Sequence, residues 1–590
     1  MTRSTGQCTL GHALMSFLPE DGDDRQPLLS RSRKILLAAD ARIDNREELA
    51  ETLGLSYSLS DAELILGGWE KWGEHTLGRL LGDFALAVWD DSRRELLLTR
   101  SPASSRTLFY HAGPRLAAFA TLPQPLNRLI PRTLNVQEMA RRLGGGAYFG
   151  NSESLFAGIH SVDPGTTVRI NDSGLSIGRY WHPELIQTVQ RKREDAAHEM
   201  EWELRRAVKA CFRRNRGPVA SHLSGGRDSA AVTSCAASLL VEENEPLIAY
   251  TAAPRIGFPQ GRGRYLHDES AQASAVARQF PNIRQMVSRS IRLPLCEALD
   301  AASRLHAAPM GNPANFAYWT RIQSEAANYG SQVLLTGANG NFSISLGGLS
   351  ALTDVVRESG LGQWWSTALD LSRSANVPWK TLLNQSFGHR MPARLHRLLR
   401  DRIHGPAGLE GYPVFSAGLR DEILRLNAEP ETRPLASYRS RVQEIYHVVD
   451  SADNLGLGLY GIDLRDPTAD RRLIDFCLSL PASDIVGSQG QRPIYDLAFS
   501  RLVPAEVRGS PLKGFQGADW FEIYDPEELR AGVRRYGENP VVREFVDLKK
   551  IEEMLDRWPT DISHDPKAYS LFANHVMVAI ALASWLNVHF

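Results

Sequence analysis

A short serine- and glycine-rich turn is the stretch of this sequence best suited to chemistry. It follows a strand-like run, leads into a helix of small residues, and reads Ser224-Gly225-Gly226-Arg227-Asp228-Ser229. Two glycines let the backbone approach an anion closely, and several N–H groups converge there with the positive end of the following helix. The turn is therefore predicted to bind phosphate. The plainer alternative is a glycine-rich strand-to-helix turn with an N-capping serine or aspartate.

This motif resembles the PP-loop of ATP pyrophosphatases, which bind the β,γ-pyrophosphate of ATP as the leaving group and transfer AMP. A Walker loop is excluded, because the pattern Gly-x-x-x-x-Gly-Lys-Ser/Thr is absent here. The resemblance implies ATP as a cofactor, bound by a segment with these members: Leu223, Ser224, Gly225, Gly226, Asp228 and Ser229.

Length and charge narrow the class of protein. A chain of 590 residues is too long for one core and predicts two to four domains. Its 67 basic and 68 acidic residues nearly balance, so no global field favours nucleic acid or an anionic membrane. Five scattered cysteines without a Cys-x-x-Cys pair, and no apolar signal run in residues 1–11, indicate a reduced cytoplasmic protein. The apolar run 576–586 is too short to span a membrane and predicts a buried terminal helix.

Residues 34–128 alternate short strands with helices. Strands are predicted at 34–39, 84–89 and 95–99, and helices at 46–53 and 61–72. The order and spacing of several stretches resemble the N-terminal glutaminase domain of class B asparagine synthetases: Ile43-Asp44-Asn45, Trp72-Gly73, the run 82–90 and Leu108-Phe109-Tyr110. The resemblance implies an N-terminal Ntn-hydrolase-like αββα domain, which we place at residues 1–187.

This domain departs from the family at its reaction centre. The family's glutaminase uses a cysteine directly after the initiator methionine, and Thr2 stands there in this chain. Asp40-Ala41 replaces the Asn-Gly pair that helps form the family's oxyanion hole, and an aspartate would repel a developing oxyanion. Trimming to Cys8, or a mature Thr2 nucleophile, are the alternatives. We predict a degenerate glutaminase-like domain.

Residues 188–590 are expected to form the second domain. The phosphate turn, the apolar run 247–251, an alanine-rich helix through residue 277 and the strand-like run 332–337 alternate as strand, helix and strand, and the run His267-Asp268-Glu269-Ser270 is predicted to cap the alanine-rich helix. This rhythm predicts an α/β fold with a doubly wound parallel sheet and ligands at the carboxyl ends of its strands. Residues 350–445 are predicted to be a mainly helical addition.

A second loop reads Thr336-Gly337-Ala338-Asn339-Gly340-Asn341, in the place of the synthetases' Ser-Gly-Glu-Gly-x-Asp motif. The resemblance implies that Thr336 and Gly337 contact adenosine, and that Ala338 stands where the family's glutamate helps ammonia attack. Asn341 can coordinate a metal through its carbonyl oxygen but adds no charge. Asp228 is then the one acidic Mg²⁺ ligand that a motif supports, with Asn341 beside it.

Two later segments complete the resemblance. The run 460–470 is similar to the synthetases' Glu-x-Arg-x-Pro-Phe-Leu-Asp segment, with Arg465 in register, and residues 510–515 match the region where the family carries a lysine that faces the phosphates. Lys513, in a glycine-bounded loop, could neutralise the α-phosphate as charge builds there. The predicted catalytic residues are Lys513, Asp228 and Arg465.

Two stretches resemble lasso peptide cyclases: the run 336–341, Thr-Gly-x-x-Gly-Asn, with Ser343 or Ser345 behind it, and the run 465–472, Arg-Asp-Pro-Thr-Ala-Asp-Arg-Arg. In that family an Asp or Glu side chain of a precursor peptide is adenylated, and the peptide's own N-terminal amine closes a macrolactam ring. The implied partners are the precursor peptide, a leader peptidase and a leader-binding protein. The alternatives are a β-lactam synthetase acting on a small β-amino acid, an asparagine synthetase-like amidotransferase, and a catalytically silent binding scaffold.

Overall fold

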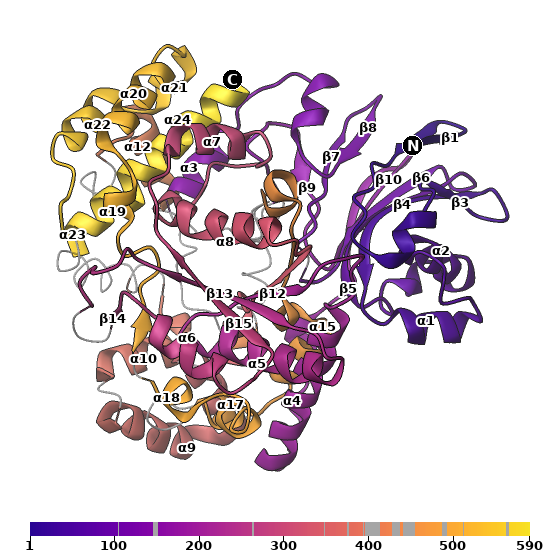
Figure 1. Ribbon diagram of the computed structural model, residues 1–590. Coiled ribbons are helices and arrows are strands. Elements are labelled where there is room, and N and C mark those ends of the chain that lie inside the picture. Colours follow the sequence, from indigo (N-terminus) through magenta and orange to yellow (C-terminus); the bar gives the residue numbers. More distant parts are fainter. Residues whose placement is uncertain are drawn as a thin grey trace.

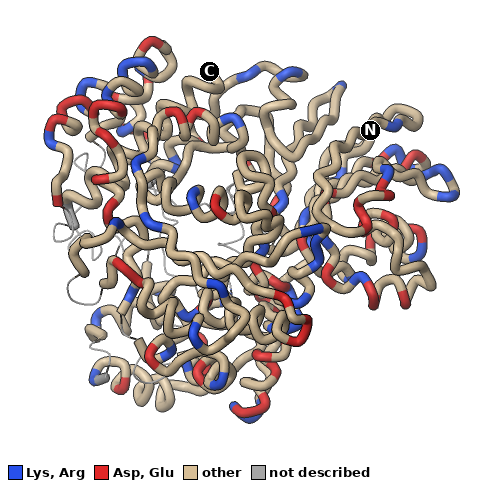
Figure 2. Tube along the Cα trace, viewed as in Figure 1, with Lys and Arg blue, Asp and Glu red and all other residues tan. Residues whose placement is uncertain are grey.

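The computed structural model shows a smaller N-terminal part beside a larger C-terminal part (Figure 1). The residues that the structure describes are 1–103, 105–144, 152–261, 265–346, 349–374, 377–392, 395, 413–427, 437–439, 455–486, 492–510, 512–561 and 566–590. Basic and acidic residues are mixed over both parts (Figure 2), as the balanced composition predicts.

The N-terminal part is built on a six-stranded sheet with strand order β11-β10-β6-β5-β4-β3. Its strands are β3 (Leu28–Leu29), β4 (Ile35–Ile43), β5 (Gly82–Asp90), β6 (Glu95–Arg100), β10 (Thr166–Asn171) and β11 (Gly174–Arg179). All neighbouring strands run antiparallel. Gly82 opens β5 at a φ of 126°, where a Cβ would overlap the carbonyl oxygen of Arg42 on β4. The close β4–β5 approach therefore requires glycine at this position.

Helices cover one face of this sheet and a second sheet covers the other. The elements are α1 (Arg46–Leu53), α2 (Asp61–Trp72), α3 (Val136–Leu143), β7 (Phe109–Ala112), β8 (Ala117–Ala120) and β9 (His160–Ser161). Leu49 of α1 and Leu64 of α2 pack with Leu86 of β5, while Tyr110 of β7 packs with Leu98 of β6 on the opposite face. Beyond the smaller sheet, α3 belongs to a buried cluster that continues into the C-terminal part. This layering agrees with the expected αββα order.

The predicted helices of this domain begin and end at residues 46–53 and 61–72, as the sequence pattern indicated. A capping box fixes the start of α2. The Ser60 hydroxyl accepts the Glu63 amide at 3.2 Å, and the Glu63 carboxylate accepts the Ser60 amide at 2.8 Å. Each bond satisfies an amide that the helix itself leaves unpaired.

The C-terminal part contains a five-stranded parallel sheet with strand order β15-β13-β12-β16-β17. Its strands are β12 (Val219–His222), β13 (Leu247–Ala253), β15 (Ile283–Arg289), β16 (Val333–Leu335) and β17 (Asp463–Arg465). The chain moves outward in one direction from β12 to β15 and in the other from β16 to β17, so the strand order reverses between β12 and β16. Ligands of such sheets bind outside the carboxyl ends of the strands at this switch point.

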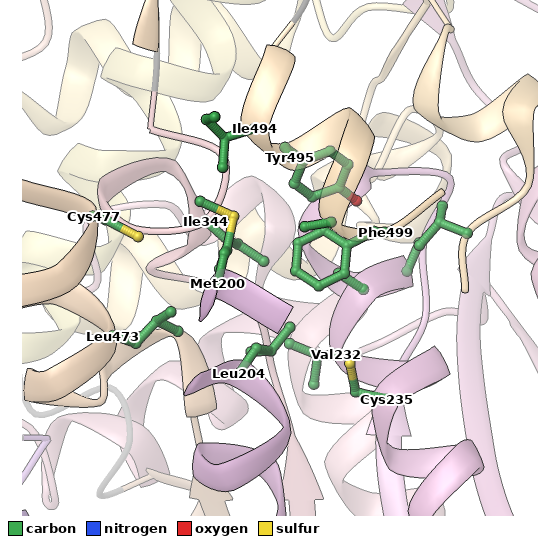
Figure 3. Packing of buried hydrophobic residues seen from close by; sticks show 14 of the residues in the cluster. Met200, Leu204, Val232, Cys235, Ile344, Leu473, Cys477, Ile494, Tyr495 and Phe499 are labelled. Carbon is green, nitrogen blue, oxygen red and sulfur yellow. The ribbon is translucent and has the colours of Figure 1, made fainter. Parts of the chain in front are cut away.

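Helices cover both faces of the parallel sheet, which confirms the doubly wound prediction. They include α4 (Arg193–Ala210), α5 (Arg227–Glu242), α8 (Phe316–Asn328), α15 (Arg471–Leu478) and α17 (Pro493–Ala498). Figure 3 shows Met200 and Leu204 of α4 packed with Val232 of α5 and Leu473 of α15 on one face. On the other face, α8 packs Ile322 against the strands.

The helical additions are described in part. Within residues 350–445 the structure describes α9 (Leu352–Ser374), α10 (Trp379–Phe387) and α12 (Ala417–Asn427), and the rest of the predicted segment lies largely outside the described residues. At the C-terminus, α24 (Met577–His589) is buried. The segment Ser570–His589 is long and apolar enough to cross a membrane, but 67% of it is buried inside the protein. We therefore assign it to the core, in agreement with the predicted buried terminal helix.

Buried ion pairs join the two parts. Arg106 of the N-terminal part lies 3.2 Å from Asp463 of β17, and also contacts Asp40 at 3.4 Å and Asp83 at 3.8 Å. Arg465 donates to the same Asp463 carboxylate at 2.7 Å. Burial acts to raise the pKa of Asp463, but Arg465 and Arg106 more than offset it and hold that pKa below its ordinary value. The N-terminal part therefore supports the edge strand β17 of the parallel sheet.

Removing Arg106 should destabilise the protein strongly. Arg106→Leu leaves the buried Asp463 carboxylate short of one partner, which costs about 3–5 kcal/mol of unfolding free energy. Because the pKa of Asp463 is lowered on folding, this contribution is present above about pH 4 and is lost as pH falls further.

Urea unfolding at pH 7 and at pH 3 measures the difference. The matched control is Arg93→Leu, because Arg93 is 76% exposed and its pairing with Asp90 should contribute less than about 1 kcal/mol. Equal losses for the two variants at pH 7 would contradict the buried-pair assignment.

Candidate active site

The predicted phosphate turn lies where the strand order reverses. The phosphate loop, defined as residues 224–229, follows β12 and runs into α5. The second loop, residues 336–341, follows the neighbouring strand β16. Both loops thus leave the carboxyl edge of the sheet side by side. This is the location that the strand rhythm predicted for a ligand.

Hydroxyl groups of the phosphate loop hold it in shape. The Ser224 amide donates to Ser229 Oγ at 3.1 Å, and the two serine hydroxyls lie 2.8 Å apart. The Gly226 amide donates to Ser224 Oγ at 3.1 Å. The loop is therefore preformed around the N-terminus of α5, a helix of 16 residues whose positive end favours an anion.

Asp228 sits in the first turn of α5 and has the properties of a cation ligand. Its Oδ1 atom is buried and has no hydrogen-bond partner among the described residues. Burial raises the pKa of this carboxyl to about 6, although Ser345 and Arg492 act to lower it. A buried carboxylate oxygen without a partner is costly unless a cation or a donor meets it.

The second loop packs directly on Asp228. A Cβ at Gly340 would overlap the carboxyl group of Asp228, and one at Gly337 would lie 2.9 Å from its backbone carbonyl carbon. On its other side, Asn339 donates its backbone amide to Asp466 at 2.7 Å and its side-chain amide at 3.0 Å. The two glycines thus let the loops from β12 and β16 meet, and Asp466 ties them to β17.

Asp228 and Asn341 share a neighbour. Ser345 Oγ donates to Asn341 Oδ1 at 3.4 Å, and Ser345 also lies close enough to Asp228 to lower the pKa of its carboxyl group. Among the described residues no group of three or more His, Cys, Asp or Glu side chains is arranged to hold a metal. The donors present, one carboxylate and one amide carbonyl, suit Mg²⁺, which usually keeps several waters and binds substrate phosphates.

The other predicted site residues differ in how far they are exposed. Thr336 and Gly337 are partly exposed at the site, as expected for residues that meet a ligand. The Leu223 side chain is fully buried in the core, so its position supports the loop from behind. Lys513 is exposed in the short strand β18 (Lys513–Gly514), which pairs with β14 (Tyr265–Leu266).

The structure places Arg465 in the boundary between the two parts, and its catalytic role stays a prediction. Its side chain is fully buried, and its guanidinium donates to the carbonyl oxygens of Cys211 at 2.8 Å and Arg213 at 2.5 Å besides Asp463. These bonds direct it into the boundary between the two domains, away from the phosphate loop. Its backbone carbonyl accepts the Thr336 amide at 2.9 Å, so Arg465 positions the second loop.

Sequence reasoning missed two residues at this site, Arg492 and Glu269. Arg492 lies close enough to Asp228 to lower its pKa, and Glu269 accepts the Gly225 amide at 3.0 Å. The sequence signal for Glu269 was its place at the start of an alanine-rich helix, which indicated only a cap. Contacts across more than 40 residues of chain have no local signature.

A separate cavity of about 470 Å³ lies between the two domains. Asp40, Arg106 and His12 line it together with Leu457 and Asp463 of the C-terminal part. Thr2 is outside this lining and pairs with Gly11 in the two-stranded sheet of β1 (Thr2–Thr5) and β2 (Cys8–Gly11). The terminal amine of Met1 donates to the His12 carbonyl at 2.6 Å. The predicted oxyanion position Asp40-Ala41 therefore lies in the lining of the cavity, and Thr2 lies next to the lining residue Gly11.

Comparisons with known proteins agree with these two parts. Residues 2–181 match the glutamine amidotransferase domain family, and residues 199–587 match the asparagine synthase family. A putative asparagine synthetase [glutamine-hydrolyzing] of Mycobacterium tuberculosis is 30% identical over 228 residues, which is 37% of this chain and 34% of that protein. Asparagine synthetase [glutamine-hydrolyzing] 3 of Bacillus subtilis is 26% identical over 258 residues, covering 41% and 40%.

Two further similarities are more distant. Amidase chyE of Penicillium rubens is 23% identical over 280 residues, which is 46% of this chain and 41% of the amidase. A solved structure of the allosteric regulatory enzyme of purine biosynthesis aligns with a TM-score of 0.21 at 15% identity, covering 46% of this chain and 63% of the enzyme's chain. A TM-score this low does not support a structural inference. The alignments span between about a third and two fifths of the length of these curated relatives. Because the matched region of the second family covers more than half of the chain, this protein belongs to the asparagine synthase family, a family of amide-bond-forming ligases.

Proposed function

We propose that this protein is an ATP-dependent macrolactam synthetase of the lasso peptide cyclase type. It adenylates an Asp or Glu side chain of a precursor peptide, and the peptide's N-terminal amine then attacks to form an isopeptide bond. The observation that carries the proposal is the pairing of a complete phosphate loop with a second loop in which Ala338 replaces the ammonia-handling glutamate. The residues expected to bind the nucleotide are present, whereas the glutamate that would assist ammonia is absent.

The chain's own residues take distinct parts in this reaction. As the substrate carboxylate displaces pyrophosphate from ATP, the amides of the phosphate loop and the N-terminus of α5 stabilise the leaving pyrophosphate. Lys513 offsets the charge that builds on the α-phosphate. Asp228, with Asn341, would hold Mg²⁺, which when bound neutralises phosphate oxygens. The attacking amine then displaces AMP and loses its proton as the amide forms.

The space between the domains supports an internal amine source. A cavity of about 80 Å³ separates Ala338 from Gly82 on the N-terminal side, and it is lined by charged residues that include Arg42, Asp44 and Asp470. Arg42 and Asp44 pair within it at 2.8 Å. An amine tethered to the substrate needs no route through this space.

The alternatives remain distinguishable. The curated relatives are named as asparagine synthetases, which favours glutamine-dependent amidation as the second candidate. A β-lactam synthetase would use the same phosphate loop on a small β-amino acid. For a lasso peptide cyclase, we expect a leader peptidase and a leader-binding protein as partners and a cytoplasmic location.

Incubation with a leader-free precursor peptide, ATP and Mg²⁺ should give a product one water lighter. Mass spectrometry should place the new bond between the N-terminus and an Asp or Glu side chain, with AMP and pyrophosphate as the other products. Formation of ADP would contradict the adenylation step. Cyclisation of small β-amino acids, with peptides left unchanged, would establish the β-lactam alternative.

Two substitutions test the catalytic assignment. Asp228→Ala should abolish turnover by removing the charged metal ligand, and Lys513→Ala should lower kcat by about two to three orders of magnitude if it acts on transition-state charge. Lys550→Ala is the matched control, because Lys550 pairs with Glu553 on α22 (Leu548–Leu555). An unchanged kcat in Lys513→Ala would show that Lys513 is an ordinary surface residue.

The purified protein should release no glutamate from glutamine and gain no activity from added ammonia. The reasons are Thr2 at the nucleophile position, Asp40 at the oxyanion position, and the ion-paired Asp40–Arg106 contact at 3.4 Å. A glutamate dehydrogenase-coupled assay measures the release directly. Glutamine-dependent amidation at a rate similar to peptide turnover would favour the asparagine synthetase alternative.

A further inference from the structure

A buried carboxylate, that of Glu269, lies between the phosphate loop and the Lys513 strand. Glu269 is 7% exposed and precedes α6 (Ser270–Ala277). Its Oε1 accepts the Gly225 backbone amide at 3.0 Å. That amide belongs to the set that a phosphate-binding loop presents to an anion. A carboxylate oxygen therefore stands where an oxygen of a phosphate group would be received.

The same carboxylate touches the strand that carries Lys513. A Cβ at Gly514 would overlap the carboxyl group of Glu269, so the carboxylate rests on the backbone of β18. Strand β18 pairs in parallel with β14, and the Phe515 amide donates to the Leu266 carbonyl at 2.7 Å. Residues 265–269 thus contact β18 at one end and the phosphate loop at the other.

Burial and the neighbouring charge make the position of Glu269 unfavourable for an anion. Burial raises the pKa of Glu269, the Gly225 amide lowers it, and neighbouring Asp268 raises it again. Asp268 itself pairs with Arg289 at 3.0 Å. Tyr318 of α8 lies near Glu269, and burial and the charge of Glu269 both raise the pKa of Tyr318. A triphosphate that enters the loop meets a like charge.

We propose that Glu269 is a positioning residue that spaces the phosphate loop from the Lys513 strand and yields the Gly225 amide to a phosphate of bound ATP. The inference rests on the proposed ATP-dependent function. It explains why both contact points are glycines: a side chain at Gly225 or Gly514 would meet the carboxylate. It also makes the entry of ATP and the placement of Lys513 parts of one rearrangement.

Two variants separate the effect of the Glu269 charge from the effect of its contact with Gly514. Glu269→Gln keeps the acceptor and the contact with Gly514 but removes the charge, so it should bind Mg-ATP about tenfold more tightly and have a higher kcat than Glu269→Ala. Glu269→Ala also removes the competing charge, but Lys513 loses its support, so kcat should fall by about tenfold or more. Recovery of kcat in the glutamine variant is a result that loss of folding would not produce.

Calorimetric titration of the full chain with ATP and Mg²⁺ measures the affinity without any peptide, so it can fail while the proposed cyclisation stands. Asp268→Asn is the matched control and should change the affinity by less than about twofold, since Asp268 makes its ion pair with Arg289. Wild-type or weaker ATP binding by Glu269→Gln would overturn the proposal.

A second pair of variants tests the contact itself. Gly514→Ala places a Cβ in the space of the Glu269 carboxyl group and should lower kcat, whereas the same change in a Glu269→Ala background meets no carboxylate and should add no further loss. Thermal melting of each variant controls for folding. Additive losses in kcat would show that the two residues act independently and would refute the positioning role.

Discussion

The contact between Gly340 and the carboxyl group of Asp228 is the constraint on which the candidate site depends. Asp228 comes from the loop after β12 and Gly340 from the loop after β16, two strands that are neighbours in the sheet although the chain between them exceeds 100 residues. Any side chain at position 340 would push the loops apart. The requirement that they touch sets the depth of the phosphate site and leaves Asp228 Oδ1 buried without a hydrogen-bond partner among the described residues.

A second constraint holds the N-terminal domain in place after its reaction centre has changed. Asp463 accepts from Arg465 of its own strand and pairs with Arg106 of the other domain, so the edge strand β17 has a charged partner on each side. Removing one partner leaves an unpaired buried charge, which destabilises a protein more than replacing the whole ion pair with apolar residues does. Changes at the predicted glutaminase positions therefore leave this contact in place, whereas the loss of Arg106 would affect strand β17 of the parallel sheet.

Local patterns in the sequence predicted the elements well and the long-range contacts poorly. Helices 46–53 and 61–72, the parallel strands and the phosphate loop follow from periodicity, capping and glycine spacing, which act over a few residues. Arg465 was assigned to catalysis from its register in a motif. Its buried bonds to Cys211 and Arg213 depend on a stretch of chain about 250 residues away, and no local pattern reports them. Glu269 was seen only as a helix cap for the same reason.

The proposed source of the amine agrees with how the two cavities are lined. Ammonia moving from the cavity of about 470 Å³ to Ala338 would meet Arg42, which lines both cavities and pairs with Asp44, and Ala338 itself has no carboxylate to assist the attack. An amine already joined to the activated carboxyl group avoids that path, and intramolecular attack can supply effective molarities of about 10⁵ M or more. Loss of the glutamate at 338 costs such a substrate little. Under the proposed function, the substitutions at the glutaminase position and at Ala338 are consequences of one change, the move from a diffusing nucleophile to a tethered one.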